Sequence, residues 1–134
     1  MIRRFNPVGV PGPFNTYSHG VEVTPPTRLL FGAGQAGVDS DGAVAAGIEA
    51  QSRLVWQHIA SILAEADMEI TDIVQLNMLL VDREDRAGAS RVRSEFLGDH
   101  RPASTLMVVS GLANPDWLIE VDFIAAKDSS TGPA

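Results

Sequence analysis

The stretch that decides the fold lies at residues 102–123 and reads PASTLMVVSGLANPDWLIEVDF. Apolar residues dominate both of its ends, and Asn114, Pro115 and Asp116 lie between them. Proline cannot donate a hydrogen bond within a sheet, and Asn and Asp tolerate turn conformations, so the pattern predicts two strands joined by a tight turn. Glu120 falls inside the second predicted strand, where a carboxylate needs a partner, a cleft or solvent.

The composition indicates one acidic globular domain. The chain has 134 residues, of which 45% are hydrophobic and 20% charged, and these values are ordinary for a soluble domain with a real core. We therefore expect a single domain over residues 1–134. Proline and glycine predict an irregular N-terminal arm at residues 1–15, and polar residues predict a tail at 128–134.

Charge and residue content exclude several classes of function. The net charge is -7 and Lys127 is the one lysine, so the sequence does not predict a nucleic-acid partner, although a single arginine can still bind a small anion. The chain has no cysteine, which excludes disulfides and thiolate chemistry. No apolar run reaches the length of a membrane span or of a signal-peptide core, so we expect a cytoplasmic protein without membrane contact.

Apolar periodicity and turn residues predict an α+β domain with the order ββαβαββ. In the second predicted helix, Arg91, Arg93 and Glu95 are interpreted as a solvated face. The predicted elements are strands at residues 18–23 and 28–33, a helix at 45–67, a strand at 73–81, a helix at 82–97 that Asp82 caps, and the two strands of the terminal hairpin.

The strand predicted at residues 73–81 has apolar side chains on both faces. Residues 73–81 and 106–109 both show this pattern, yet two helices on one face of a mixed sheet leave the other face uncovered. An uncovered apolar face favours self-association. The alternative is that loops and the N-terminal arm cover it.

One glycine-rich segment matches a nucleotide-binding motif only in its residue spacing. Residues 32–37 read GAGQAG and match the dinucleotide-binding pattern, but Val38 and a turn at 39–42 follow where that motif requires a helix. A glycine-rich strand edge that a ligand can approach closely is the better interpretation.

The three histidines, His19, His58 and His100, show no metal-ligand spacing, and the sequence predicts no metal site.

Six short segments occur along the chain in this order: FNTYSHGV (14–21), LFGAGQ (30–35), IEAQ (48–51), DIV (72–74), PAST (102–105) and IEVD (119–122). Taken together, they resemble the RidA/YjgF family over about residues 12–127. The resemblance implies a chorismate-mutase-like fold and a homotrimer whose sheets pack into a central barrel, with three ligand clefts between subunits. It also implies hydrolysis of small enamines and imines, such as 2-aminoacrylate, to a 2-keto acid and ammonia, with no cofactor.

The chain departs from the family at the position that binds the substrate carboxylate. Active deaminases of the family read Pro-Ala-Arg-Ser, whereas this chain has Ser104 in place of the arginine, which places it in an Arg-lacking branch. Loss of a guanidinium and carboxylate pair from a desolvated site costs on the order of a few kcal/mol. Restoring it with Ser104→Arg is therefore expected to raise activity. Arg101 is either a replacement that reaches the cleft or a surface residue.

The resemblance implies a site with catalytic and ligand-positioning groups. Glu120 would orient or deprotonate a water and Tyr17 would close the cleft; the alternatives are a salt bridge across subunits for Glu120 and interface packing for Tyr17. The function is then either a weak or altered imine hydrolase or a non-catalytic trimer that binds a small metabolite. The candidate ligand-binding residues are Gly32, Ala33, Gly34, Ser90, Arg101 and Ser104.

Overall fold

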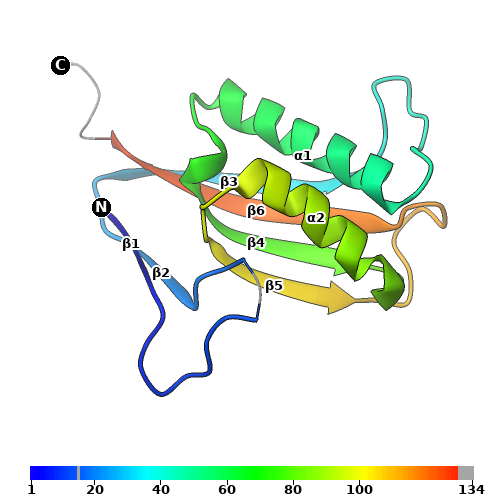
Figure 1. Cartoon of the computed structure of the whole chain (residues 1–134). Helices are drawn as coiled ribbons and strands as arrows, with labels where there is room; N and C mark the ends of the chain where they lie inside the picture. Colours follow the sequence, from blue (N-terminus) through cyan, green and yellow to red (C-terminus); the bar gives the residue numbers. More distant parts are fainter. Residues whose placement is uncertain (15, 130–134) are drawn as a thin grey trace.

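The computed structural model describes residues 1–14 and 16–129 and shows both helices on one face of a mixed sheet (Figure 1). Within these residues the main sheet has four strands in the order β3-β6-β4-β5, and β1 and β2 form a separate pair. This arrangement confirms the predicted α+β fold. The elements are β1 (Ile2–Phe5), β2 (Gly20–Val23), β3 (Thr27–Ala36), α1 (Ile48–Glu65), the 3₁₀ turn η1 (Ile70–Asp72), β4 (Ile73–Leu80), the 3₁₀ turn η2 (Arg83–Asp85), α2 (Arg86–Leu97), β5 (Ala103–Val108) and β6 (Ile119–Asp128).

The predicted hairpin between β5 and β6 is wrong. β4 lies between these two strands, antiparallel to β6 and parallel to β5. A parallel pair needs a crossover connection, and α2 provides it between β4 and β5. The turn residues at 114–116 therefore belong to a loop that passes the end of β4 rather than to a tight hairpin turn.

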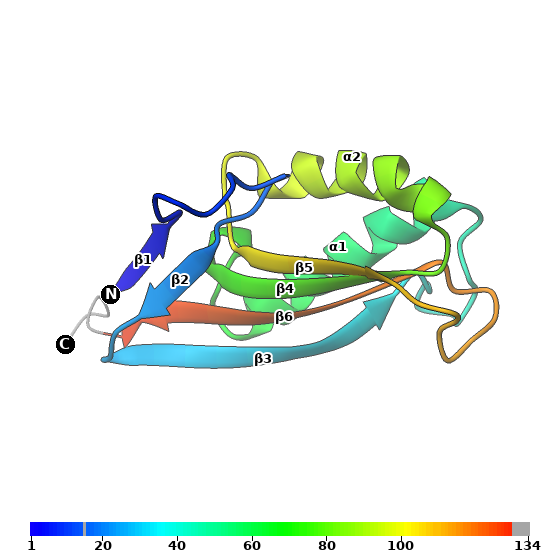
Figure 2. The ribbon, with the colours of Figure 1, turned by 90° about the horizontal axis from the view of Figure 1, so that it is seen from below.

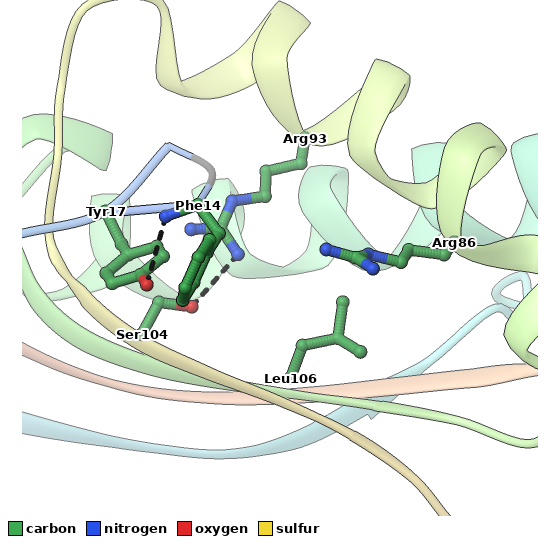
Figure 3. Close-up of a pocket in the computed structure, with 6 residues that line it drawn as sticks. All are labelled: Phe14, Tyr17, Arg86, Arg93, Ser104 and Leu106. Atoms are coloured by element: carbon green, nitrogen blue, oxygen red, sulfur yellow. Dashed lines mark hydrogen bonds between the residues drawn. The ribbon is translucent and has the colours of Figure 1, made fainter. Parts of the chain in front are cut away.

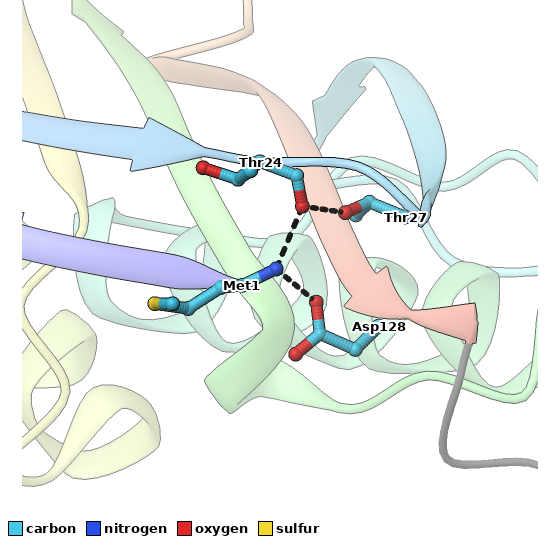
Figure 4. A network of polar contacts seen from close by, with 4 residues as sticks. All are labelled: Met1, Thr24, Thr27 and Asp128. Carbon is cyan, nitrogen blue, oxygen red and sulfur yellow. Dashed lines mark hydrogen bonds and ion pairs between the residues drawn. The ribbon is translucent and has the colours of Figure 1, made fainter.

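The N-terminal arm is more regular than the sequence suggested. β1 pairs antiparallel with β2, so residues 2–5 form a strand and the expectation of an irregular arm over 1–15 is wrong there. The amino nitrogen of Met1 lies 2.7 Å from the carbonyl oxygen of Thr24 and 2.7 Å from Asp128 Oδ1 (Figure 4). These contacts attach the chain start to the end of β6. Asp128 of the predicted polar tail is part of β6, and residues 130–134 of that tail lie outside the described residues.

The hydrophobic core lies between the helices and the sheet. α1 buries Val55, Trp56, Ile59 and Leu63 at an i, i+4 and i+7 to i+8 spacing, as its periodicity predicts. Asp82 Oδ1 accepts a hydrogen bond from the Glu84 amide at 2.9 Å, so it caps η2, which leads into α2. Neither helix in the described part of the chain is long and apolar enough to cross a membrane.

The other face of the sheet carries exposed apolar side chains. Leu29 is 54% exposed, Phe31 70% and Met107 46%, so the loops and the N-terminal segment do not cover these residues. The β1–β2 pair lies toward one end of the sheet (Figure 2). We call this surface, opposite the helices, the open face.

Candidate functional site

A cavity of about 290 Å³ lies between α2 and β5, on the helix side of the sheet (Figure 3). Its walls combine cationic, aromatic and small polar side chains, which suits an anionic organic ligand of small size. The lining residues are Phe14, Tyr17, Arg86, Arg93, Ser104 and Leu106.

Strand alternation places two of these residues. In the parallel register, Ser104 lies beside Leu76 and Leu106 beside Met78. Leu76 and Met78 are fully buried under the helices. Because side chains alternate between the faces of a strand, Ser104 and Leu106 also point toward the helix side. The hydroxyl of Ser104 therefore opens into this cavity.

Helix periodicity places the two arginines. Arg86 and Arg93 are seven positions apart on α2, about two turns, so they share one helix face. Arg93 is only 3% exposed, and its interpretation as part of a solvated face is therefore wrong. Residues distant in the chain decide which helix face is buried, and here Ser104 of β5 and Thr16 lie against Arg93.

The Arg93 guanidinium is held by neutral oxygens. Its Nη1 donates to Ser104 Oγ at 3.0 Å and its Nη2 donates to the carbonyl of Thr16 at 2.7 Å. Its Nε is buried and has no hydrogen-bond partner among the described residues, and none of their carboxylates forms an ion pair with it. Burial of a cation without a counter-ion is costly, so the arrangement is suited to receiving an anion.

Burial also affects the acid-base properties of Arg93. Desolvation, with a smaller contribution from repulsion by Arg101, lowers the pKa of Arg93 to about 10. This value still lies well above neutral pH, so the guanidinium keeps its charge. A perturbed cation in a cavity is a typical feature of a functional site.

Tyr17 forms an aromatic wall beside this cation. The Ser18 amide donates to the Pro102 carbonyl at 2.9 Å, which holds the segment before β2 against the start of β5. The Tyr17 hydroxyl accepts a hydrogen bond from the Phe14 amide at 3.2 Å (Figure 3). Phe14 itself is 84% exposed at the cavity mouth. Tyr17 and Ser104, both predicted site residues, are therefore brought together.

Two other predicted ligand-binding residues lie outside the cavity lining. Arg101 Nη1 donates to the carbonyls of Gly98 and His100, at 2.7 and 3.1 Å. Arg101 is thus used to hold the turn before β5, and Arg93 is the arginine that contacts Ser104. Ser90 shares the helix face of Arg93 but does not line the cavity.

Glu120 lies on the open face. Its register partner in β4 is Leu79, and its neighbours Ile119 and Val121 are buried on the helix side. A Cβ at Gly34 would lie 2.5 Å from Glu120 Oε2, so the carboxylate lies directly over the backbone of Gly34.

Gly32 has a different neighbour: a Cβ there would lie 2.1 Å from the ring of Phe123, which belongs to the core, so this glycine makes room for a core side chain. Ala33 lies in the irregular register between residues 32 and 35. Within one chain, the predicted site is therefore split between two faces of the sheet: Tyr17 and Ser104 on the helix side, Gly34 and Glu120 on the open face.

Two of the three histidines, His58 and His100, make structural contacts through their rings. His58 Nε2 lies 2.6 Å from the Val38 carbonyl and His100 Nε2 lies 2.6 Å from the Ile73 carbonyl, so both nitrogens donate. Burial lowers the pKa of His100, more than its bond to Ile73 raises it. Within residues 1–14 and 16–129, no three His, Asp or Glu side chains are grouped as metal ligands.

Sequence reasoning missed Arg86, Arg93 and Phe14 as cavity residues. The seven-residue spacing of the two arginines was available as a signal, because it puts both on one helix face. That spacing is equally typical of a solvated surface, so it did not distinguish the two cases. Phe14 follows a proline-rich segment with no periodicity that predicts its position.

Comparison with known proteins gives the class of protein. The family profile described as Endoribonuclease L-PSP matches residues 9–127. A RutC family protein of Pyrococcus abyssi is 35% identical over 120 residues, which cover 88% of this chain and 91% of the relative. The 3-aminoacrylate deaminase RutC of Acinetobacter baylyi is 30% identical over 121 residues, which cover 89% of this chain and 93% of that enzyme.

A solved structure agrees with these relatives. A conserved Rid-family protein of unknown function from Yersinia pestis superposes with a TM-score of 0.81 at 27% identity, covering 92% of this chain and 97% of the other. The chain therefore belongs to the RidA/YjgF family, whose profile carries the endoribonuclease L-PSP description. The resemblance seen in the sequence is confirmed, and relatives of this chain include a 3-aminoacrylate deaminase.

Proposed function

We propose that this protein hydrolyses small enamines or imines to a carbonyl compound and ammonia, with altered specificity, as a homotrimer with ligand clefts between subunits. The observation that carries the proposal is the Arg93 guanidinium, buried and without an anionic partner among the described residues, at hydrogen-bond distance from Ser104. A cation is thus present beside the position from which the family arginine is missing.

Arg93 would bind the substrate carboxylate. A guanidinium offers several donors in a plane and forms charge-assisted bonds with a carboxylate, which Ser104 alone cannot do. Arg93 approaches from α2 rather than from β5, so a bound carboxylate would sit differently from one held by an arginine on the strand. This difference supports altered specificity rather than the simple loss of activity that Ser104 suggests by itself.

A neighbouring subunit would complete the site. Leu29, Phe31 and Met107 make the open face suited to burial against another copy of the chain. Glu120 and Gly34 lie on that face, so assembly can bring them to the cavity of an adjacent chain. The intersubunit clefts that the family resemblance implies support this arrangement.

The reaction requires only a held substrate and a positioned water. Water attacks the carbon of the protonated C=N bond while Glu120 accepts a proton from it, giving a carbinolamine. Proton transfer to nitrogen then allows the C–N bond to break, with release of ammonia and formation of the C=O bond. Tyr17 would close the cleft around the reacting carbon, and Arg93 would fix its orientation.

Metabolite binding without catalysis is the second candidate. It is favoured by the position of Glu120, which within one chain lies on the opposite face of the sheet from the cavity. Ribonuclease activity is not proposed, although the family description mentions it, because a net charge of -7 opposes binding to a phosphate backbone.

The test measures imine hydrolysis directly. An amino-acid oxidase generates the imine, semicarbazide traps what remains, and the wild type is compared with Arg93→Gln, Glu120→Gln and Tyr17→Phe. If the Arg93 pair contributes roughly 3 kcal/mol to transition-state binding, Arg93→Gln lowers kcat/KM by on the order of a hundredfold. Arg101→Gln tests the other arginine near residue 104, and Arg83→Gln, which removes the same charge from an exposed position outside the cavity, is the matched control.

The outcomes separate the two candidate functions. Catalysis is supported if the wild type accelerates imine loss and Glu120→Gln loses this activity while remaining folded and assembled. Wild-type protein that leaves imine loss unchanged for every amino acid tried contradicts catalysis, and ligand binding then becomes the better assignment. An effect of Arg101→Gln as large as that of Arg93→Gln would contradict the role given to Arg93.

A further inference from the structure

Arg86 is a second cation in the same cavity. It lines the cavity two helical turns before Arg93, and its guanidinium points into the space above Leu106 (Figure 3). In the described part of the chain, no carboxylate forms an ion pair with Arg86, even though Asp85 directly precedes it. One carboxylate bound at Arg93 leaves this second charge unexplained.

Two like charges in one small cavity repel each other unless an anion lies between them. The Cα atoms of Arg86 and Arg93 are about 10 Å apart along the helix, given a rise of about 1.5 Å per residue. Their long side chains converge on a cavity of about 290 Å³. A ligand with one anionic group balances only one of them, whereas a ligand with two anionic groups balances both.

We infer that the cavity selects small dianionic ligands, and that its substrates are imines or enamines of dicarboxylic acids. Arg93 binds the carboxylate next to the C=N carbon, beside Ser104, and Arg86 binds the distal carboxylate. Leu106 packs against the methylene groups between them. The reaction named here rests on the proposed function, but the selection for two carboxylates is a property of binding alone.

The two arginines are expected to have different roles in ligand binding, because they differ in burial. Arg93 is buried and fixed by Ser104 and Thr16, so its geometry is preorganised for one carboxylate. Arg86 is exposed and lies at the first position of α2, so it adapts to chains of different length. Binding at Arg93 is therefore expected to be common to all ligands, and discrimination is expected to depend on Arg86.

The experiment measures binding of two stable keto acids by calorimetry at constant ionic strength. The probes are 2-oxoglutarate and 2-oxopentanoate, which have the same number of carbons and differ by a carboxylate in place of the terminal methyl. The wild type is expected to bind 2-oxoglutarate at least about tenfold more tightly. Arg86→Gln should abolish this preference and keep the affinity for 2-oxopentanoate, whereas Arg93→Gln should weaken both.

Arg83→Gln is the matched control, because it removes the same charge from an exposed position three residues from Arg86 and outside the cavity. It should leave both affinities within about twofold of the wild type. Inorganic phosphate is a third probe. If it binds as tightly as 2-oxoglutarate, the cavity selects ligands by their negative charge alone and not by two separated carboxylates, and the inference is wrong. Equal binding of the two keto acids by the wild type, or a preference that survives Arg86→Gln, also overturns it.

Failure of this inference is distinct from failure of the proposed function. Keto-acid binding is measured without turnover. If the protein discriminates between the probes but hydrolyses no imine, the proposed catalysis is wrong and the inference of a site for dianionic ligands still holds. If the protein hydrolyses monocarboxylic imines at least as fast as dicarboxylic ones and shows no preference between the probes, the proposed catalysis holds and the inference of a site for dianionic ligands is wrong. Size exclusion of each variant confirms that assembly is unchanged.

Discussion

Arg93 Nη1 donates a hydrogen bond to Ser104 Oγ over 3.0 Å, and this bond joins the buried face of α2 to the start of β5. The two residues are also related through the charge of the cavity. Ser104 is the position at which the family resemblance implies an arginine, and Arg93 brings a guanidinium to it from the helix. Under the proposed function, the charge is kept in the cavity but is carried by α2 instead of β5.

This relationship reverses the expectation for Ser104→Arg. From the sequence alone, the substitution should restore carboxylate binding. In the structure, a new guanidinium at residue 104 would replace a hydrogen-bond acceptor of Arg93 with a second buried cation. We expect Ser104→Arg to lower the free energy of unfolding by about 1 to 3 kcal/mol, as measured by urea unfolding, without a gain in imine hydrolysis.

The double variant Ser104→Arg/Arg93→Gln provides the control for this prediction. It has one cation in the cavity, now on the strand, so its stability should return toward the wild type and its hydrolysis of monocarboxylic imines should exceed that of Arg93→Gln. A single Ser104→Arg variant that is both stable and more active would contradict the position given to Arg93.

Gly34→Ala is expected to impair catalysis without unfolding the protein. The new Cβ would lie 2.5 Å from Glu120 Oε2, which is the movable end of a side chain, so the carboxylate shifts while the strand stays in place. Because small displacements of a catalytic group are costly, kcat should fall on the order of tenfold or more. Steady-state kinetics and thermal unfolding together measure the two effects.

Gly111→Ala is the matched control, since a Cβ there meets nothing within 4 Å. It should retain wild-type kinetics. If Gly34→Ala also retains them, the carboxylate over Gly34 has no part in the reaction, and the role proposed for Glu120 fails.

Phe31→Glu is expected to disrupt the proposed trimer. Phe31 is 70% exposed on the open face, where it lies beside Ile124 of β6, and a buried carboxylate in an interface between copies is strongly unfavourable. Light scattering coupled to size exclusion should give three chains of 14.3 kDa for the wild type and a smaller species for the variant. Val8→Glu adds the same charge at a fully exposed residue and should leave the mass unchanged. A wild-type monomer at micromolar concentration would refute the shared cleft.

Protonation of His100 is expected to destabilise the protein at low pH. Burial holds the pKa of His100 below its ordinary value of 6.5, so the unfolded chain takes up a proton at a higher pH than the folded one. The free energy of unfolding should therefore be fully maintained above about pH 6.5 and fall as the pH drops below it. Urea unfolding at several pH values measures this slope.

His100→Gln tests whether His100 causes this loss of stability at low pH, because glutamine can still donate to the Ile73 carbonyl but does not titrate. The variant should show a flatter stability profile between neutral and mildly acidic pH. His58→Gln removes the other histidine that donates to a carbonyl and should leave the His100 contribution in place. Identical slopes for the wild type and His100→Gln would show that other groups dominate.

The sequence by itself determined the local elements and the family. The apolar spacing in α1 and the apolar runs that form β4 and β5 depend on near neighbours in the chain, so these elements could be predicted from residue order. The expectation that Ser104 replaces a family arginine also came from residue order alone. Pairing of β5 with β4 could not, because a register between distant segments depends on the crossover through α2 and not on the turn residues at 114–116.

Only the tertiary structure decided which cation serves the cavity. Arg93 and Arg101 are alike in the sequence, because both precede residue 104 and each has one polar neighbour, Ser94 or His100. Folding leaves Arg101 on the carbonyls of Gly98 and His100, and buries Arg93 between α2 and β5, where it meets Ser104 and Thr16. The physical reason is that the burial and direction of a long side chain depend on what packs over it, and residues far away in the chain supply that packing.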